Sequence, residues 1–454
     1  MLNVTVLLKF YKGEISPFDE SALECALSME DASITLVAMA PLSVKERLLA
    51  LTRLGDVKAV LIADEKYRGS DTLATAKVLS RAISELKPDL VLCGRQSMDG
   101  DTAQVPAQVA TLLGYDLITN AMDFSLDKIN TRLGKSKVNL PAVISVERIK
   151  NLRFPSLRSK TKTLEVWDND RLKLSSTEVG LNGSKTKVLK VFDKEKSQRK
   201  CKFVSSKELK SIILDGLKKE KISVSKAPSE NKLDKIFIIG LGVLDTAKSL
   251  AKEVEIVDGE SAEEISKILK EKKAKHVLFE ATLKNRTLAP KVSAILDSGL
   301  AADCIGVETD GKNLFVYRPA NCESVVAKIG FTDGIEMATV RCVKNSDDLI
   351  FSVGYGAKDY LTKIEDFAKK FDGKITSSRK IVDNGVLGYE YQVGLTGKIV
   401  SPKVYVAMGI SGEIQHVVGF ENATTVIAIN KDKNAKIFDY ADYGVVEDIK
   451  NVEL

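Results

Sequence analysis

The segment 392–416, QVGLTGKIVSPKVYVAMGISGEIQH, is the most informative part of the chain. Its apolar run 404–408 predicts a buried strand that leads directly into the turn 409–412 and then into a helix. A strand, a glycine-containing turn and a helix in this order expose backbone N–H groups at a helix N-terminus, where phosphates and diphosphates bind. The Ser411 hydroxyl adds a donor beside Gly412. Glycine-containing turns of this kind are common, so the pattern alone is compatible with both a phosphate site and a plain turn.

The same alternation of strand and helix runs along most of the chain. Short apolar runs bounded by turn residues predict buried strands at 3–8, 33–38, 57–62 and 88–93, and again at 235–240, 276–281, 314–318, 404–408 and 425–430. Segments with helical spacing of apolar residues separate them, as at 71–86, 260–272 and 360–371. This alternation predicts the α/β class, with three doubly wound parallel-sheet units of the adenine-nucleotide or flavodoxin-like kind.

Length and composition agree with this plan and exclude several classes of protein. At roughly 150 residues per domain, 454 residues predict about three domains. The six cysteines contain no CxxC pair and there are only two histidines, which argues against a zinc or iron–sulfur site. A net charge of +6 gives no nucleic-acid signature. No apolar stretch approaches the roughly 20 residues that span a bilayer, and we expect a cytoplasmic protein that is not embedded in a membrane.

A basic region interrupts the alternation between about 150 and 232. Lys and Arg are dense there and the periodicity weakens, which is compatible with a solvated, loop-rich arm or with a docking surface for another protein. Residues 226–232, KAPSENK, have the composition of a linker.

Several single residues have both a structural and a functional interpretation. His416 lies one turn into the predicted helix, where a lone histidine is more often structural than catalytic, and Arg379 would ordinarily be a solvated charge. The stretch 392–398 contains two glycines, a threonine and a lysine, and it can form a second anion-binding loop or a plain turn. Asn430 ends an apolar strand and therefore lies at the carboxyl edge of the sheet, where ligands of open α/β sheets bind.

A polar loop follows the predicted strand that ends at Cys93. Its carboxylates suggest a Mg²⁺ site, whereas its threonine and backbone donors suggest a turn that faces a phosphate. The candidate residues of this loop are Asp99, Gly100, Asp101, Thr102 and Gln104. The chain has neither a Walker lysine loop nor a GxGxxG fingerprint, which weakens an NTPase and an ordinary Rossmann dehydrogenase as interpretations.

At these residues the chain resembles the electron transfer flavoproteins. Up to about residue 225 it is similar to the beta subunit, in ISPFDESALECAL, YRGSDTLATAKVL, PDLVLCGRQSMDGDTAQV and NLRFPSLRSKTK followed by LEVW. The remainder is similar to the alpha subunit, in ATLKNRTLAPKVSAILDSGLAADC, RPANCESVVAKI, MATVR, SSRKIVD, the whole of 392–420 and NKDKNAKIFDYADYGVVEDI. The resemblance covers nearly the whole chain and implies a single-chain fusion of two subunits that are normally separate.

The resemblance implies four parts: a beta-type nucleotide-binding domain (1–184), a basic wrapping arm with a linker (185–232), an alpha-type N-terminal domain (233–345) and an FAD-binding domain (346–454). It implies that Ser378 and Arg379 lie beside the flavin ring, Thr396 near N5 and His416 near the C2 carbonyl. Ser411 and Gly412 correspond to the diphosphate turn, and Asn430 and Asp448 to the adenosine end. The remaining residues expected at the FAD are Gln392, Val393, Gly394, Gly397, Lys398 and Gln415. A guanidinium and an imidazole at the ring would set the flavin potential without transforming a substrate.

Three departures from the family pattern affect the expected redox tuning. The turn 354–356 is Gly-Tyr-Gly where the family has an arginine, so one cation at the diphosphate is missing. Leu395 replaces a glutamine before Thr396, and the alpha-type N-terminal domain is shorter than usual.

The resemblance leaves the second ligand and the reaction as alternatives. The DGDTAQV loop is similar to that of members with a second FAD, so a second FAD is preferred over AMP in the N-terminal domain. The leading hypothesis is a redox carrier, rather than a substrate-transforming enzyme, that accepts electrons from flavin dehydrogenases such as the acyl-CoA dehydrogenases of fatty acid beta-oxidation and passes them to a membrane quinone oxidoreductase. Residues 151–163 would be its docking loop. The alternatives are an electron-bifurcating flavoprotein that oxidises NADH and a nucleotide-sensing module without redox activity.

Overall fold

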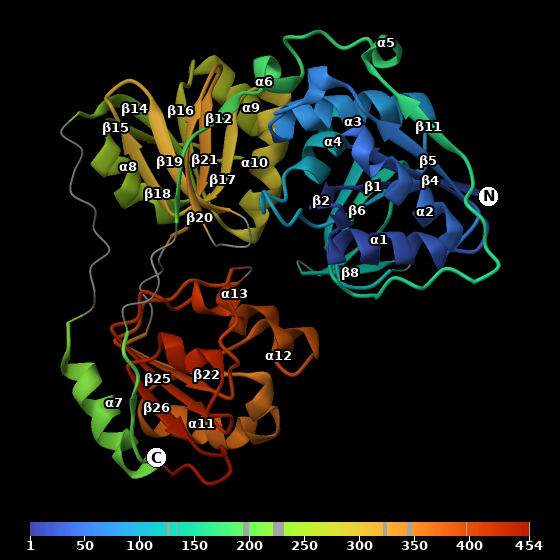
Figure 1. The fold of residues 1–454 in the computed structure, drawn as a ribbon. Helices are drawn as coiled ribbons and strands as arrows, with labels where there is room; N and C mark the ends of the chain where they lie inside the picture. Colours follow the sequence, from blue (N-terminus) through green and yellow to red (C-terminus); the bar gives the residue numbers. More distant parts are fainter. Residues whose placement is uncertain are drawn as a thin grey trace. The chain divides into compact units, whose positions relative to one another are not determined.

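The computed structural model describes residues 1–124, 128–132, 134–193, 199–220, 231–320, 325–342, 347–395 and 397–453. The chain forms two compact units (Figure 1). Unit 1 comprises Met1–Asp193 and Ser229–Val340, and unit 2 comprises Lys194–Pro228 and Arg341–Leu454. The α/β class with parallel sheets, predicted from the sequence, is confirmed.

The first sheet of unit 1 has nine strands in the order β11-β5-β4-β1-β6-β10-β7-β8-β9. Their bounds are β1 (Leu2–Leu8), β4 (Ala32–Met39), β5 (Val57–Ile62), β6 (Leu90–Gly94), β7 (Asp116–Ala121), β8 (Ile129–Thr131), β9 (Gly134–Ser136), β10 (Ala142–Val146) and β11 (Leu164–Trp167). Val4 and Val6 pack on one face with helix α1 (Pro17–Leu27), and Leu7 packs on the other with α3 (Thr72–Leu86). Both faces of β1 are therefore covered by helices, which is why its sequence is continuously apolar.

The order of these strands creates a switch point beside β1. β1 pairs in parallel with β4 on one side and with β6 on the other, because the chain first runs outward to β5 and then returns. The loops that follow β1 and β6 consequently diverge and leave a crevice at the carboxyl edge of the sheet. Residues 95–104 fill the connection from β6 to α4 (Val105–Leu113).

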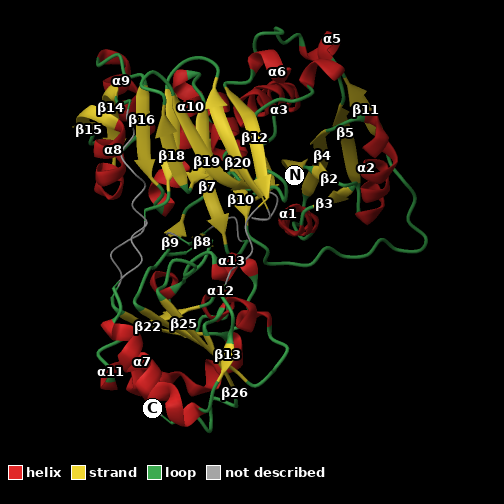
Figure 2. Cartoon of the chain, turned by 60° about the vertical axis from the view of Figure 1, so that its left-hand side comes forward, coloured by secondary structure: helices red, strands yellow, loops and turns green. Residues whose placement is uncertain are grey.

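The second sheet of unit 1 repeats part of this topology. Its order is β15-β14-β16-β21-β17, with the bounds β14 (Leu233–Ile239), β15 (Ala251–Ile256), β16 (His276–Glu280), β17 (Leu300–Cys304) and β21 (Glu336–Val340). As β10 inserts between β6 and β7, so β21 inserts between β16 and β17. Only residues 281–282 connect β16 to α10 (Leu283–Leu296), so this copy has no counterpart of the loop 95–104. Helices α8 (Leu244–Leu250) and α9 (Ala262–Glu271) complete this part of unit 1 (Figure 2).

A four-stranded antiparallel sheet joins the two halves of unit 1. It has the order β12-β20-β19-β18, with β12 (Thr186–Asp193), β18 (Gly306–Thr309), β19 (Leu314–Ala320) and β20 (Val325–Phe331). The segment of the predicted arm that begins at residue 186 therefore pairs with β20. Gln104 Nε2 donates to the Leu300 carbonyl at 3.2 Å, which adds a buried contact between α4 and the second half.

Unit 2 is built on a six-stranded parallel sheet in the order β13-β26-β25-β24-β22-β23. The strands are β13 (Lys202–Phe203), β22 (Leu349–Val353), β23 (Lys374–Ser377), β24 (Val404–Met408), β25 (Thr425–Asn430) and β26 (Tyr443–Val446), and the helices are α7 (Leu209–Lys218), α11 (Leu361–Lys370), α12 (Arg379–Asp383) and α13 (Ile414–Val417). Leu209 and Ile213 of α7 share one core with Ile364 of α11, so residues 199–220 of the arm complete both the sheet and its helical layer. β22 pairs with β23 on one side and β24 on the other, which places a switch point between β22 and β24.

Candidate functional site

The turn after β24 packs backbone against backbone with its neighbours in unit 2. Gly412 has φ +93°, and a Cβ at this position would collide with the backbone nitrogen of Ile437. The Ile437 N–H donates to the Ser411 carbonyl at 3.1 Å, which locks the turn to the loop after β25. The helix expected to begin at this turn is α13, which starts only at Ile414 and ends at Val417. Gly412 is thus required by the close approach of two backbones as well as by its positive φ.

Asn430 and Asp448 hold the neighbouring loops at the same edge of the sheet. The Asn430 side chain donates to the Ile410 carbonyl at 2.9 Å and accepts from the Asp432 N–H at 3.0 Å. Asp448 follows β26 and accepts from the Lys450 N–H at 2.9 Å. Both side chains therefore stabilise loops at the carboxyl edge, and their expected contact with an adenosine stays a prediction.

The described residues of the segment 392–398 form a tight loop whose backbone is bonded to the end of β23 and to α13. The Val393 N–H donates to the Ser377 carbonyl at 2.9 Å, and the Leu395 N–H donates to the Gln415 carbonyl at 2.7 Å. Gly394, with φ +132°, and Lys398 close the loop through a backbone bond of 3.1 Å. Gln392 and Gly397 belong to the same loop, whereas Thr396 lies outside the described residues. The loop is compact and its backbone is held at both ends.

His416 is buried beneath this loop and both ring nitrogens have partners. Nδ1 lies 3.0 Å from the Val393 carbonyl and Nε2 lies 3.0 Å from the Tyr405 hydroxyl. Because a carbonyl can only accept, Nδ1 carries the proton and the tyrosine donates to Nε2. Burial lowers the pKa of His416 to about 4, although the bond to Val393 acts in the opposite direction. The imidazole is therefore neutral at pH 7 and braces the loop; its expected approach to a flavin carbonyl stays a prediction.

Ser378 and Arg379 lie where β23 ends and α12 begins. The Arg379 Nε lies 3.0 Å from Asp383 Oδ2, and about one third of the arginine side chain is exposed. The preceding residue, Ser377, has a buried Oγ to which no described residue forms a hydrogen bond. A buried hydroxyl without a protein partner is costly, so this atom is suited to a polar group of a ligand.

Together these loops fit a dinucleotide. Apart from Thr396, the predicted residues come from segments that follow four parallel strands, β23 to β26, and they lie at the carboxyl edge of one sheet. The glycine turn would let a diphosphate approach backbone N–H groups. The residues present therefore fit FAD at the switch point of unit 2.

Unit 1 contains a cavity of about 1420 Å³ at the carboxyl edge of its first sheet. Four of the five residues predicted in the loop after β6 line it, namely Asp99, Gly100, Thr102 and Gln104. Asp101 does not line it; its carboxylate accepts from Gln96 Nε2 at 3.1 Å. Asp101 and Ala103 have φ values of +52° and +54°, so this loop holds two non-glycine residues in the left-handed region. Such backbone strain concentrates at ligand sites.

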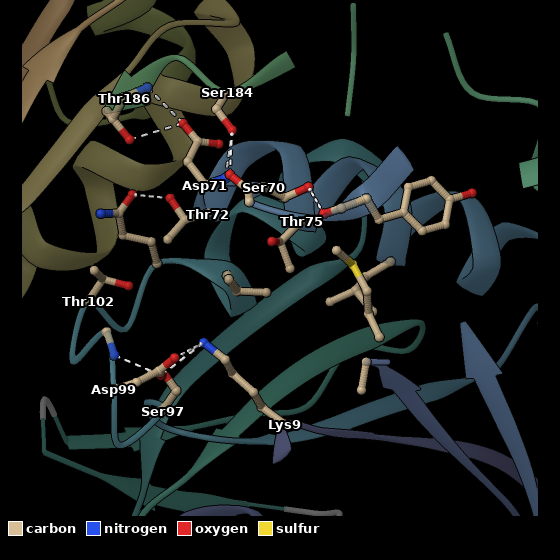
Figure 3. A pocket seen from close by; sticks show the side chains of 18 of the residues that line it. Lys9, Ser70, Asp71, Thr72, Thr75, Ser97, Asp99, Thr102, Ser184 and Thr186 are labelled. Carbon is tan, nitrogen blue, oxygen red and sulfur yellow. Dashed lines mark hydrogen bonds and ion pairs between the residues drawn. The ribbon is translucent and has the colours of Figure 1, made fainter. Parts of the chain in front are cut away.

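The walls of this cavity form a polar network around the loop (Figure 3). Lys9, after β1, pairs with Asp99 at 2.8 Å across the switch point. Burial raises the pKa of Asp99, but the Lys9 ammonium and several hydrogen bonds outweigh it, so that the pKa lies below its usual range. Asp71 caps α3 and also accepts from the Thr186 N–H at 2.9 Å, which ties the cavity rim to β12. Asp99, paired with Lys9, and Asp101, bonded to Gln96, therefore act as structural anchors of the loop. Among the described residues, no group of three metal-ligating side chains occurs.

Sequence reasoning missed two cavity residues and one residue of unit 2. Arg318 of β19 donates to the Gly100 carbonyl and to the Ala302 carbonyl, so it fixes the loop from the second half of unit 1. Asp19 accepts from the backbones of Lys9 and Gly94, and burial raises its pKa to about 6. Tyr405, which orients His416, sits inside an apolar strand. Each contact joins residues that are distant in sequence or hidden in an apolar pattern, so no local signal marks them.

The loops at the carboxyl edges of the first sheet of unit 1 and of the unit 2 sheet are those of a nucleotide-binding α/β protein. Comparisons with known proteins identify its family. The electron transfer flavoprotein domain matches residues 4–172 and again 256–346, the two related halves of unit 1, and the electron transfer flavoprotein FAD-binding domain matches residues 345–421. The chain belongs to the electron transfer flavoprotein family.

Its relatives include both subunits of that family, which agrees with a fused form. The chain is 35% identical over 238 residues to the electron transfer flavoprotein subunit alpha of Thermoanaerobacterium thermosaccharolyticum, which covers 42% of this chain and 72% of the relative. It is 37% identical over 204 residues to the subunit beta of Megasphaera elsdenii, covering 40% and 76%. It is also 30% identical over 257 residues to the acryloyl-CoA reductase electron transfer subunit beta of Anaerotignum propionicum, covering 40% and 70%. Within the described ranges, no helix has both the length and the apolar character needed to cross a bilayer.

Proposed function

We propose that this chain is a single-chain electron carrier that holds FAD at the carboxyl edge of the unit 2 sheet. It would accept electrons from flavin dehydrogenases, such as acyl-CoA dehydrogenases, and deliver them to a membrane quinone oxidoreductase or a similar acceptor. The observation that carries the proposal is the convergence of the glycine turn, the loop 392–398 and Ser378–Arg379 on one switch point within the FAD-binding family match.

In this proposal the protein binds and tunes the cofactor. Bound FAD supplies one- and two-electron redox chemistry. The Arg379 guanidinium keeps its charge at any working pH and favours negative charge on the flavin, while its ion pair with Asp383 restricts its position. His416 contributes through Val393, whose backbone it holds in place. The chain needs no general acid or base of its own, because no bond of a substrate is broken.

The loop 151–163 supports docking to a protein partner. Phe154 and Leu157 are 95% and 100% exposed. The loop is nevertheless held at both ends, since Arg153 pairs with Glu24 at 2.7 Å and the Lys162 N–H donates to Thr52 Oγ1 at 2.8 Å. Two large apolar side chains in water on an anchored loop suit insertion into a groove of a partner.

The cavity of unit 1 supports a second nucleotide, and its size favours FAD over AMP. Typical ligand pockets measure about 300–1,000 Å³, and a volume of about 1420 Å³ exceeds what a mononucleotide fills. A second flavin here supports the alternative function, an electron-bifurcating flavoprotein that oxidises NADH.

The cofactor part of the proposal is tested by the visible spectrum and nucleotide content of the purified chain. We expect absorbance near 450 nm, two FAD per chain and no AMP. One FAD with AMP would contradict the second flavin, and a colourless protein that carries only AMP or ATP would contradict the carrier function. Anaerobic NADH separates the two redox functions, since bleaching of the flavin favours the alternative.

The docking part is tested by electron transfer from an acyl-CoA dehydrogenase to the doubly substituted Phe154→Ser, Leu157→Ser variant. We expect slower transfer with unchanged flavin content and thermal stability, because both side chains are in water. Leu241→Ser is a matched control, because Leu241 is 65% exposed elsewhere on unit 1. Equal rates for both variants would refute the docking assignment.

A further inference from the structure

Two lysines lie over one tyrosine ring at the switch point of unit 2. The Nζ atoms of Lys358 and Lys380 lie 4.8 Å and 4.2 Å from the centroid of the Tyr355 ring, which is within the range of cation–π attraction. Lys358 belongs to the 3-10 helix Tyr355–Tyr360 after β22, whereas Lys380 belongs to α12 after β23. The Tyr355 ring therefore contacts two lysines that follow different strands, β22 and β23.

This group of three residues, the Tyr355 cluster, has positive charge without a matching carboxylate. No ion pair joins either lysine to an acidic residue in the part of the chain that the structure describes. Two ammonium groups beside one ring repel each other, and the π face offsets only part of that repulsion. An anion bound between the two ammonium groups would remove this repulsion.

The location of the Tyr355 cluster identifies the anion. Gly354 and Gly356, on either side of the tyrosine, donate through their N–H groups to the Met408 and Gly409 carbonyls at 2.8 Å and 3.1 Å. The cluster is therefore joined directly to the turn 409–412, the part of unit 2 best suited to phosphate. The switch point between β22 and β24 lies between these two segments.

We propose that Lys358 and Lys380, held together by Tyr355, bind the diphosphate of the dinucleotide in unit 2 and set its affinity. The inference rests on the proposed function for the identity of the ligand. The two ammonium groups neutralise the phosphate oxygens, while the turn 409–412 supplies N–H donors. Tyr355 is a positioning residue, because it acts through the lysines.

The experiment compares FAD release from the holoprotein on dilution, followed by flavin fluorescence, between wild type and the doubly substituted Lys358→Gln, Lys380→Gln variant. We expect FAD affinity to fall by roughly tenfold per lysine and to lose most of its dependence on NaCl concentration. The matched control is Lys369→Gln with Lys374→Gln, which removes the same charge at the end of α11 and the start of β23, the opposite edge of the sheet. FAD in unit 1 would dissociate as a separate phase that neither variant changes.

Two further variants test the role of the ring. Tyr355→Phe keeps the π face and should retain wild-type affinity, whereas Tyr355→Leu should weaken FAD binding several-fold although both lysines remain. Equal affinity and equal salt dependence in the lysine variant and its control would overturn this inference and leave the carrier function standing. A wild-type protein that binds no flavin would instead refute the proposed function itself.

Discussion

Acidification should destabilise unit 2 through His416. In the native state the ring is buried and neutral, with its proton donated to Val393 and its other nitrogen accepting from Tyr405. A proton added to Nε2 would place an uncompensated charge in the core. The Tyr405 hydroxyl, which donates to Nε2 in the native state, would then have to accept a hydrogen bond from it. The cost of this protonation is the reason for the lowered pKa.

The sign and size of the effect follow from proton linkage. Burial lowers the pKa from 6.5 to about 4, so between these values the unfolded chain binds a proton that the native state does not. Stability is therefore fully present above pH 6.5 and is lost as the pH falls toward 4. At 1.36 kcal/mol per pH unit, the loss due to this one group is about 3 kcal/mol.

Tryptophan fluorescence does not report on unit 2, because the only tryptophan, Trp167, lies in unit 1. The measurement must therefore use a signal from unit 2 itself. Hydrogen–deuterium exchange of peptides from β24 and β25 reports the free energy of opening there, once corrected for intrinsic exchange rates. The control is His416→Gln, whose amide can donate and accept without titrating. We expect the wild type to lose about 3 kcal/mol more than this variant between pH 7 and pH 4. An identical pH dependence in the two proteins would show that His416 is not a buried neutral residue.

Three further substitutions test the geometry of the two sites. Gly412→Ala forces a Cβ into the backbone of Ile437 at φ +93°, so we expect a loss of several kcal/mol in unit 2 and poor flavin retention, measured by thermal unfolding and by the absorbance ratio of flavin to protein. Arg318→Met removes the bond that holds the loop at Gly100, together with the bond to Ala302 that orients the guanidinium, and it should release the nucleotide of unit 1 while the flavin of unit 2 stays bound; simultaneous loss of both would contradict this assignment. Tyr405→Phe leaves a buried imidazole nitrogen without its donor, at a cost of roughly 1–3 kcal/mol in the opening of β24 by hydrogen exchange; an unchanged value would mean that the hydroxyl does not donate to the ring.

The fold was predictable because the strands that build it are buried on both faces. The expected strand at 3–8 is β1, Leu2–Leu8, and the runs 404–408 and 425–430 coincide with β24 and β25. Continuous apolar runs bounded by turn residues identify such strands without knowledge of their neighbours. The strand order, the insertion of β21 between β16 and β17, and the pairing of β12 with β20 depend on long-range contacts, so no local pattern encodes them.

Loops that follow strands were predictable as site candidates for a related reason. In a parallel sheet the residue after each strand lies at the same edge, so Ser378, Ser411 and Asn430 converge once the strands are known. The Tyr355 cluster was not predictable, since the sequence at 354–356 indicated only that an arginine was missing. The lysines that supply charge there come from two segments, and only the fold brings them to one ring.

The two related halves of unit 1 contribute differently to its cavity. In the first half, residues 95–104 separate β6 from α4 and form the polar rim of the cavity. In the second half, the corresponding connection is reduced to residues 281–282, and Glu280 at the end of β16 accepts from the Gly242 N–H at 3.1 Å. A carboxylate of the protein thus takes a backbone donor that would otherwise face a ligand phosphate at that switch point. The second half instead supports the first, since Arg318 donates to the Gly100 carbonyl of the loop and the Leu300 carbonyl accepts from Gln104 at the start of α4. In the proposed function, the first half would bind the nucleotide and the second half would hold the binding loop in place.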